Sequence, residues 1–133
     1  MLTRLNHIAI ACQDLAKASR FYADTLGAKV GDPQELSDHG VRVAFVKLQN
    51  TVIELLEPFG ENSPIAGFLS KSNGGIHHIC IETDDIDHAC QTLSQKGVRI
   101  LGDGMPKIGA HGKPVIFLHP KDCFDTLIEL EQS

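Results

Sequence analysis

The chain repeats its own pattern, and this repeat constrains the fold more than any other feature of the sequence. Four segments of the first half recur in the second half in the same order. The matched pairs are 5–18 ("LNHIAIACQDLAKA") with 76–89 ("IHHICIETDDIDHA"), 26–30 with 96–100, 40–49 with 112–121, and 52–57 ("VIELLE") with 127–132 ("LIELEQ"). Such ordered matches indicate two copies of one structural unit. We therefore expect one α+β domain over 1–133, with module one at about 1–60, a linker at about 61–75 and module two at about 76–133.

Each module is predicted to have the order β-α-β-β-β. In module one, the apolar alternation and the helix signals predict a strand at 5–12, a helix at 14–27 capped by Asp14, a short strand at 28–32, and a hairpin of 41–48 with 51–57. Module two copies this order, with Asp85 as the helix cap and final strands at 114–119 and 126–132. The linker is predicted to hold a short helix, with Ser63 as its cap and Pro64 in its first turn.

Two histidines and two glutamates occupy equivalent positions in the repeat. His7 aligns with His78, and Glu54 aligns with Glu129. Alternate strand residues face opposite sides, so His7 faces away from Ile8 and Ile10, which should meet the helix. The same parity places His78, Glu54 and Glu129 on the face without the helix. His77, next to His78, is predicted to start its strand on the helix side.

A buried carboxylate needs a partner, water or a metal ion. Two imidazoles and two carboxylates suit a divalent ion of the first transition series, and a pseudo-twofold axis would bring all four together. Four protein ligands leave two octahedral positions, which favours cobalt, nickel, manganese or iron, while zinc stays open. The alternative is that the histidines are structural and the glutamates face solvent on alternating strands.

Composition narrows the class of function. The net charge is −5 and there is no long basic run, so nucleic acid is not an expected partner. No apolar run approaches the ~20 residues of a membrane span, and no secretory leader is evident, which favours a cytoplasmic protein. The four cysteines show no CxxC spacing and are expected to be buried free thiols. The segment 106–114 carries Lys107, His111 and Lys113, and it is either an anion-binding loop or a solvated one.

The repeated modules and the His/Glu set resemble those of a known family. Paired β-α-β-β-β modules with a His/Glu set resemble the vicinal oxygen chelate superfamily, which includes glyoxalase I. Within it, 50–69, 74–86 and 107–122 ("KIGAHGKPVIFLHPKD") closely resemble segments of the methylmalonyl-CoA epimerases. The resemblance covers nearly the whole chain. It implies the glyoxalase-like half-barrel fold with a cleft.

The resemblance also implies an activity. An epimerase of this family interconverts (R)- and (S)-methylmalonyl-CoA by removing the proton next to the thioester, through an enolate. Carried over by position, the metal ligands are His7, His78, Glu129 and Glu54, with cobalt or another divalent ion. Two bases on opposite faces are the simplest design for epimerisation, and Glu129 and Glu54 are the candidates. The CoA phosphates would meet Lys113, His111 or Lys107, and the assembly is expected to be a homodimer.

Two positions depart from the family pattern. Some members carry a catalytic carboxylate where this chain has Val43. Relatives often have Gly-Gly where this chain has Phe124-Asp125. Two other functions remain open. One is glyoxalase I, which needs the same His/Glu set but not the "GAHGKPV" loop. The other is a metal-free binding protein of the bleomycin-resistance type, which usually lines its cleft with aromatic residues.

Overall fold

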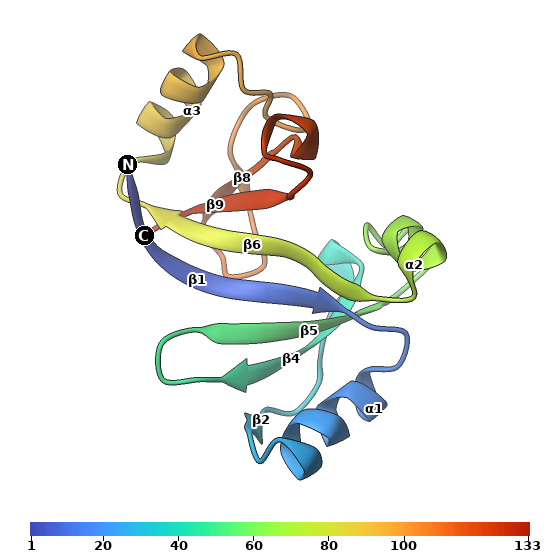
Figure 1. The fold of residues 1–133 in the computed structure, drawn as a ribbon. Helices are drawn as coiled ribbons and strands as arrows, with labels where there is room; N and C mark the ends of the chain where they lie inside the picture. Colours follow the sequence, from blue (N-terminus) through green and yellow to red (C-terminus); the bar gives the residue numbers. More distant parts are fainter. The chain divides into compact units, whose positions relative to one another are not determined.

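The first six residues lie with the second half of the chain. The computed structural model describes residues 1–133 and divides them into two compact units (Figure 1). We call His7–His77 the N-terminal unit, and Met1–Asn6 together with His78–Ser133 the C-terminal unit. The backbone N–H of Asp84 donates to the Met1 carbonyl over 3.4 Å, and Thr3 Oγ1 donates to the Glu82 carbonyl over 3.1 Å. These bonds explain why residues 1–6 group with module two.

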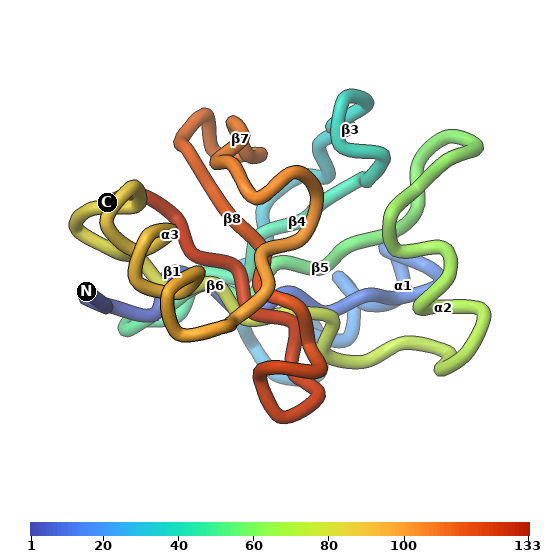
Figure 2. Tube along the Cα trace, turned by 90° about the horizontal axis from the view of Figure 1, so that it is seen from above, coloured from blue at the N-terminus to red at the C-terminus, as the bar shows by residue number.

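The N-terminal unit is a sheet with a helix on one face. Its elements are β1 (Leu2–Ala11, from His7 onward), α1 (Leu15–Arg20), the π-helical turn η1 (Phe21–Thr25), β2 (Lys29–Val30), β3 (Gln34–Leu36), the 3-10 turn η2 (Ser37–His39), β4 (Val41–Lys47), β5 (Val52–Pro58) and α2 (Ala66–Ser72). The strand order is β2-β4-β5-β1, with β1 and β5 parallel and with β3 paired to β4. Figure 2 shows the Cα trace of these strands, with β1, β3, β4 and β5 labelled. The predicted order is confirmed here, and β3 is an addition that sequence patterning missed.

The C-terminal unit repeats this arrangement with shorter strands. Its elements are β6 (Gly75–Thr83, from His78 onward), α3 (Ile86–Gln95), β7 (Lys107–Ile108), β8 (Pro114–Leu118), the 3-10 turn η3 (Pro120–Asp122) and β9 (Ile128–Gln132). The order is β6-β9-β8-β7, with β6 and β9 parallel. The copy of β2 that we expected at 96–100 is only a single bridge between Ile100 and Leu118, because the chain departs into a loop there.

The helix starts repeat in the same detail. Asp14 accepts from the N–H of Lys17, and Asp85 accepts from the N–H of His88, so both predicted caps are confirmed. The side chain that ends the parallel strand also reaches the first helical N–H. Glu57 accepts from Leu15, and Gln132 accepts from Ile86, over 3.1 and 2.9 Å. In both units, the strand–helix junction is therefore fixed from two sides.

Each sheet buries different side chains on its two faces. In the N-terminal unit, Ile10, Ile53 and Leu55 pack with Leu15 of α1, whereas Ala9, Ala11 and Leu56 form a cluster with Ile65 and Leu69 from the α2 segment. In the C-terminal unit, the face toward α3 is apolar. Ile81, Ile116, Leu118, Ile128 and Leu130 of the strands pack there with Ile86 and Ala89 of α3. The opposite face of that sheet carries the polar residues described below.

The linker differs from expectation at its start. The N-cap of α2 is Ile65, and Ser63 Oγ only accepts a long bond of 3.5 Å from the Ile65 N–H. After the helix, Asn73 and Gly74 both have positive φ, and a Cβ on Gly74 would lie 2.8 Å from the Ala11 carbonyl oxygen. Glycine is therefore required there on steric grounds. None of the helices has the length and apolar character needed to cross a bilayer.

Candidate functional site

The N-terminal unit buries a histidine against a carboxylate. His7 Nδ1 lies 2.9 Å from Glu54 Oε2, and the two residues are 3% and 6% exposed. They come from the parallel strands β1 and β5, in which Ala9 is opposite Glu54. His7 is therefore on the same face as Glu54, which is the face away from α1. Strand parity predicted this placement for both residues.

The C-terminal unit contains the equivalent pair. His78 Nε2 lies 3.2 Å from Glu129 Oε2, and both residues are buried. They come from the parallel strands β6 and β9, in which Cys80 is opposite Glu129. The ring of Phe117 meets the His78 ring edge-on, with centroids 5.5 Å apart. The side chains of each unit thus pair one imidazole with one carboxylate away from water.

The repeat extends to the residue behind each carboxylate. Phe45 of β4 is opposite Glu54, and Phe117 of β8 is opposite Glu129. The strand of each glutamate therefore has the histidine on the neighbouring strand on one side and the phenylalanine on the neighbouring strand on the other. The donor atoms, imidazole nitrogen and carboxylate oxygen, are the kinds that bind divalent transition-metal ions. Each pair could contribute two ligands to such an ion.

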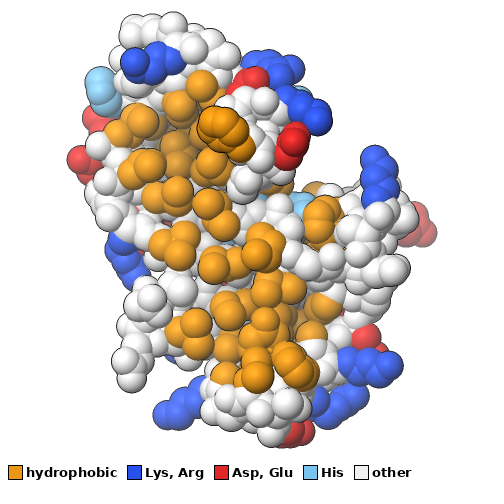
Figure 3. All heavy atoms as spheres, in the orientation of Figure 1, with side chains coloured by type: hydrophobic (Ala, Val, Ile, Leu, Met, Phe, Trp, Pro, Cys, Tyr) orange, Lys and Arg blue, Asp and Glu red, His pale blue; other side chains and the backbone are white.

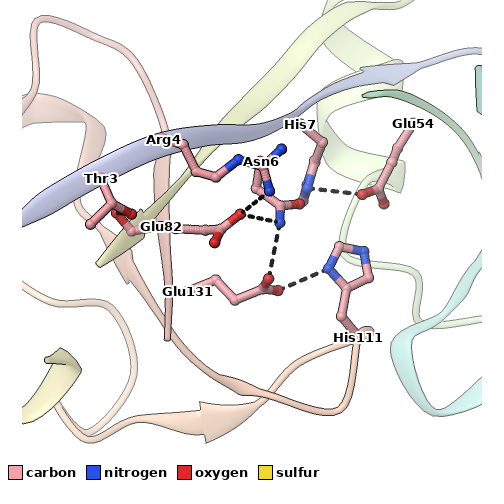
Figure 4. Close-up of polar contacts among 8 residues, drawn as sticks. All are labelled: Thr3, Arg4, Asn6, His7, Glu54, Glu82, His111 and Glu131. Carbon is pink, nitrogen blue, oxygen red and sulfur yellow. Dashed lines mark hydrogen bonds and ion pairs between the residues drawn. The ribbon is translucent and has the colours of Figure 1, made fainter. Parts of the chain in front are cut away.

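Two further carboxylates of the C-terminal unit were missed by the sequence analysis. Glu82 of β6 and Glu131 of β9 are buried, with Glu131 only 2% exposed. Asn6 Nδ2 donates to both, over 3.0 Å to Glu82 and 3.2 Å to Glu131 (Figure 4). Arg4 adds an ion pair with Glu82 at 2.9 Å. A signal was available, because Glu82 and Glu131 share strand parity with His78 and Glu129.

The three residues predicted to meet an anion, in and beside the loop between β7 and β8 of the C-terminal unit, have different surroundings. Lys107 forms an exposed ion pair with Asp103 at 2.7 Å. His111 turns inward, and its Nδ1 lies 2.9 Å from Glu131 Oε1 (Figure 4). The Lys113 side chain is exposed and forms no ion pair. Of the three side chains, Lys113 is the one that can meet an anion without losing a partner.

Comparison with known proteins shows the family to which the chain belongs. The family model of the Glyoxalase/Bleomycin resistance protein/Dioxygenase superfamily matches residues 6–117. The chain is 62% identical to the ethylmalonyl-CoA/methylmalonyl-CoA epimerase of Cereibacter sphaeroides, over 99% of each chain. It is 59% identical to the mitochondrial methylmalonyl-CoA epimerase of Bos taurus, over 99% of this chain and 75% of that protein.

A solved structure gives the same result for the fold. A variant of the Streptomyces coelicolor methylmalonyl-CoA epimerase, in complex with 2-nitronate-propionyl-CoA, superposes with a TM-score of 0.89 at 40% identity. The match covers 100% of this chain and 96% of that chain. The chain belongs to the methylmalonyl-CoA epimerase family. The α+β, glyoxalase-like fold class that the resemblance implied is thereby confirmed.

Both departures from the epimerase family pattern have a defined structural setting. Val43 is fully buried in the apolar cluster around Ala9, Leu56 and Ile65, so its position is part of the core in this chain. Phe124 and Asp125 both adopt left-handed backbone conformations, with φ of 55° and 61°, and the Phe124 side chain is fully exposed. They form the loop that leads into β9, two residues before the strand starts.

The remaining histidines and cysteines of this epimerase-family chain have structural surroundings. His77 packs edge-on against Phe68 of the α2 helix, which is a different helix from the one expected. His119 caps η3 by accepting from the Lys121 N–H. The four cysteines are free thiols, as predicted, but the expected burial holds for Cys80 only, since Cys12, Cys90 and Cys123 are partly exposed. Burial, with help from Glu57 and Asp14, raises the pKa of the Cys12 thiol to about 11, so this thiol stays protonated near neutral pH.

Surface side chains separate by type. Figure 3 shows apolar side chains exposed on the face of the molecule seen there, and lysine and arginine side chains that project from it. The large apolar residues with high exposure include Met105 and Ile108 beside the basic loop, and Phe124. In the C-terminal unit, exposed apolar and cationic groups therefore occur within the same segment, 105–113.

Proposed function

We propose that this chain interconverts the (R) and (S) forms of methylmalonyl-CoA by moving a proton off and onto C2. The observation that carries the proposal is the repeated buried pair, His7 with Glu54 and His78 with Glu129, in a chain 62% identical to an ethylmalonyl-CoA/methylmalonyl-CoA epimerase. Burying a carboxylate is costly unless it is paired, hydrated or bound to a metal ion, so a carboxylate kept buried beside an imidazole in both units is a candidate for a chemical role. An acyl-CoA malonate carries the acidic C2 proton that such a carboxylate could remove.

We also propose that His7, Glu54, His78 and Glu129 hold one divalent metal ion. The donor set fits, because it offers two nitrogen and two carboxylate oxygen ligands on buried faces. Co²⁺ is the first choice, followed by Ni²⁺, Mn²⁺, Fe²⁺ and Zn²⁺. When bound, the ion would supply the positive charge that stabilises negative charge developing on the thioester oxygen.

Glu129 is proposed as the first base and Glu54 as the second. The Glu129 carboxylate accepts the C2 proton, the C2–H bond breaks, and its electron pair moves into the thioester carbonyl. Protonated Glu54 then delivers a proton to the opposite face of C2, and the electron pair returns to form the new C2–H bond. The neighbouring imidazoles orient each carboxylate through the bonds of 2.9 and 3.2 Å. Epimerisation requires access to both faces, which a pair of bases provides.

Lys113 is the proposed contact to the phosphates of CoA. Its ammonium group is exposed, whereas Lys107 must first leave Asp103 and His111 must leave Glu131. The Lys107–Asp103 pair is a surface pair, so the cost of separating it is small. Lys107 is therefore a second contact, and His111 contributes to CoA binding through the loop while it stays bonded to Glu131. The family resemblance also supports a homodimer, and a cytoplasmic location stays a proposal.

The test is proton exchange at C2. The protein is loaded with Co²⁺, mixed with (R)- or (S)-methylmalonyl-CoA in deuterated water, and followed by mass spectrometry and NMR. We expect deuterium at C2 and racemic product, and a large loss of exchange after the metal is removed by chelation. Ethylmalonyl-CoA tests how large a C2 substituent is accepted.

Two control arms separate the alternatives. If the protein instead converts the glutathione hemithioacetal of methylglyoxal and leaves C2 of methylmalonyl-CoA unlabelled, it is a glyoxalase. If purified protein binds none of the five metals after reconstitution and exchanges no proton, the metal-free binding function stands in its place.

A further inference from the structure

The buried carboxylate of Glu131 has no part in the proposed proton transfer, yet it is the most buried acidic group of the molecule at 2% exposure. It projects from β9 on the same face as Glu129, two residues away. A carboxylate so placed must have its oxygens hydrogen-bonded. Its Oε2 accepts from Asn6 Nδ2 at 3.2 Å, and its Oε1 lies 2.9 Å from His111 Nδ1 (Figure 4).

The nearby guanidinium group of Arg4 pairs with Glu82 and not with Glu131. Arg4 bonds to Glu82 at 2.9 Å, and Asn6 divides its amide group between Glu82 and Glu131. The other groups close to Glu131 are Cys80 and Glu129, whose Sγ and carboxylate oxygen lie within 4.8 Å of a Glu131 oxygen. His111 is therefore the ionisable side chain that bonds to Glu131, and it belongs to the loop between β7 and β8.

That loop has little regular structure to hold it. It connects β7, which has two exposed residues, to β8. Within it, the Gly109 N–H donates to the Lys113 carbonyl at 2.9 Å, and the Gly112 N–H donates to the Gly109 carbonyl at 3.0 Å. These bonds fold the loop on itself and do not attach it to the sheet. The bond from His111 to Glu131 connects the loop to a buried position on β9.

We propose that Glu131 is a positioning residue that acts through His111 to hold the β7–β8 loop, and Lys113 with it, in the conformation that binds the phosphates of CoA. This inference rests on the proposed function for its ligand. Lys113 lies two residues after His111, so a fixed His111 restricts where its ammonium group can reach. Glu131 itself, being buried, does not touch the ligand.

The first experiment measures the loop without any substrate. Hydrogen exchange of the Gly109 and Gly112 amides reports opening of the loop, because both are bonded inside it. Glu131→Ala is expected to speed exchange at both amides about tenfold, the effect of losing a hydrogen bond to a charged group. Glu82→Ala is the matched control, since it removes an equally placed carboxylate that contacts Arg4 and Asn6 but not the loop.

The second experiment is a double-mutant cycle on binding of free CoA, measured by calorimetry. Glu131→Ala should weaken CoA binding about 10-fold, and raise KM with little change in kcat. In a His111→Ala background, the same substitution should have no further effect, because Glu131 acts through His111. Glu131→Gln keeps the shape and one acceptor oxygen, so it should restore most of the binding. If the alanine variant fails to fold, His111→Ala takes its place in the exchange experiment, because it removes the other end of the same bond.

Several outcomes would overturn the proposal. They are an unchanged exchange rate at Gly109 and Gly112 in Glu131→Ala, a loss of kcat in place of a change in KM, or an undiminished effect of Glu131→Ala in the His111→Ala background. Failure of the proposed epimerase activity leaves the exchange experiment intact. The two ideas can therefore fail separately.

Discussion

The two units share their His–Glu pairs but differ in what surrounds them. By the repeat, Ala9, Ala11 and Leu56 of the N-terminal unit correspond to Cys80, Glu82 and Glu131 of the C-terminal unit. The first three pack with Ile65 and Leu69 from the α2 segment. Of the counterparts, Glu82 bonds to Arg4 and Asn6, and Glu131 bonds to Asn6 and His111.

Equivalent positions of the two sheets are thus covered in two different ways. In the N-terminal unit, the apolar side chains of Ile65 and Leu69 from the linker cover this part of the sheet face. In the C-terminal unit, the buried carboxylates of Glu82 and Glu131 bond to residues at the N-terminus and to the loop between β7 and β8. The comparison teaches that the repeat preserves the groups with a chemical role, while the neighbouring positions adapt to the segment that covers them.

The largest expected effect tests whether the two carboxylates are equivalent. Glu129→Gln should lower the rate of C2 proton exchange by about 10²–10⁴-fold, because it removes the general base but keeps the shape. Glu54→Gln should stop inversion while leaving some exchange at the face that Glu129 reaches. The measurement is deuterium incorporation beside product stereochemistry, with metal content checked by mass spectrometry. A Glu129→Gln variant with normal metal content and full activity would falsify the assignment.

The second effect tests the contrast between the apolar cluster of the N-terminal unit and the hydrogen-bonded carboxylates of the C-terminal unit. Leu56→Glu copies Glu131 into the N-terminal unit, where the surrounding cluster is apolar. An uncompensated buried charge should cost about 3–5 kcal/mol of the free energy of unfolding. Urea denaturation measures it, and Leu56→Met, expected to cost under about 1.5 kcal/mol, is the control. If Leu56→Glu is as stable as Leu56→Met, the two faces are less different than their packing indicates.

A smaller effect concerns the chain that leads into each parallel strand. β5 follows a short hairpin turn, whereas β9 follows the left-handed Phe124 and Asp125. Phe124→Gly should raise the unfolding free energy by about 0.5–1 kcal/mol, because glycine removes the left-handed strain and an exposed ring loses no packing. Phe124→Ala should leave stability nearly unchanged, since it keeps the strain. Thermal unfolding compares the three proteins, and equal midpoints for glycine and alanine would refute strain at this position.

The smallest effect is electrostatic. Hydrogen bonds and charge from Arg99 lower the pKa of Asp122 to about 2 from 3.8. A lowered pKa in the folded state gives stability that is present above the unfolded value and is lost as the pH falls through about 2. Arg99→Gln should therefore lower the melting temperature slightly at pH 5 and above, with the difference from the original protein shrinking between pH 4 and pH 2. A difference that stays constant over that range would exclude this pair as its source.

The sequence predicted the parts of the fold that depend on periodicity. Period-two alternation placed His7, Glu54, His78 and Glu129 on the faces without α1 and α3, and the caps at Asp14 and Asp85 are where expected. These features depend on neighbours a few residues away. The repeat added the correspondence between the two halves, including strand order.

The features that were missed depend on distant or weak contacts. Glu131 meets His111 and Asn6, and no local pattern links a strand residue to a loop or to the first strand. The copy of β2 is only one bridge at Ile100, and the sequence did not predict this loss, because a two-residue strand gives almost no periodic signal. Residues 1–6 group with module two through contacts such as the bond from the Asp84 N–H to the Met1 carbonyl, which link residues too distant along the chain for a local pattern to predict.

The junction after α2 has a practical consequence for rearranging the chain. A boundary between repeated modules is an obvious place to open a protein for circular permutation or to insert a reporter domain. Here that choice would fail, because Gly74 has a φ of 124° and passes so close to the Ala11 carbonyl oxygen that even a Cβ does not fit. Loop tips with exposed side chains tolerate new ends better. The exposed turn at Gly60–Glu61 is thus the better place for new termini in this half of the chain.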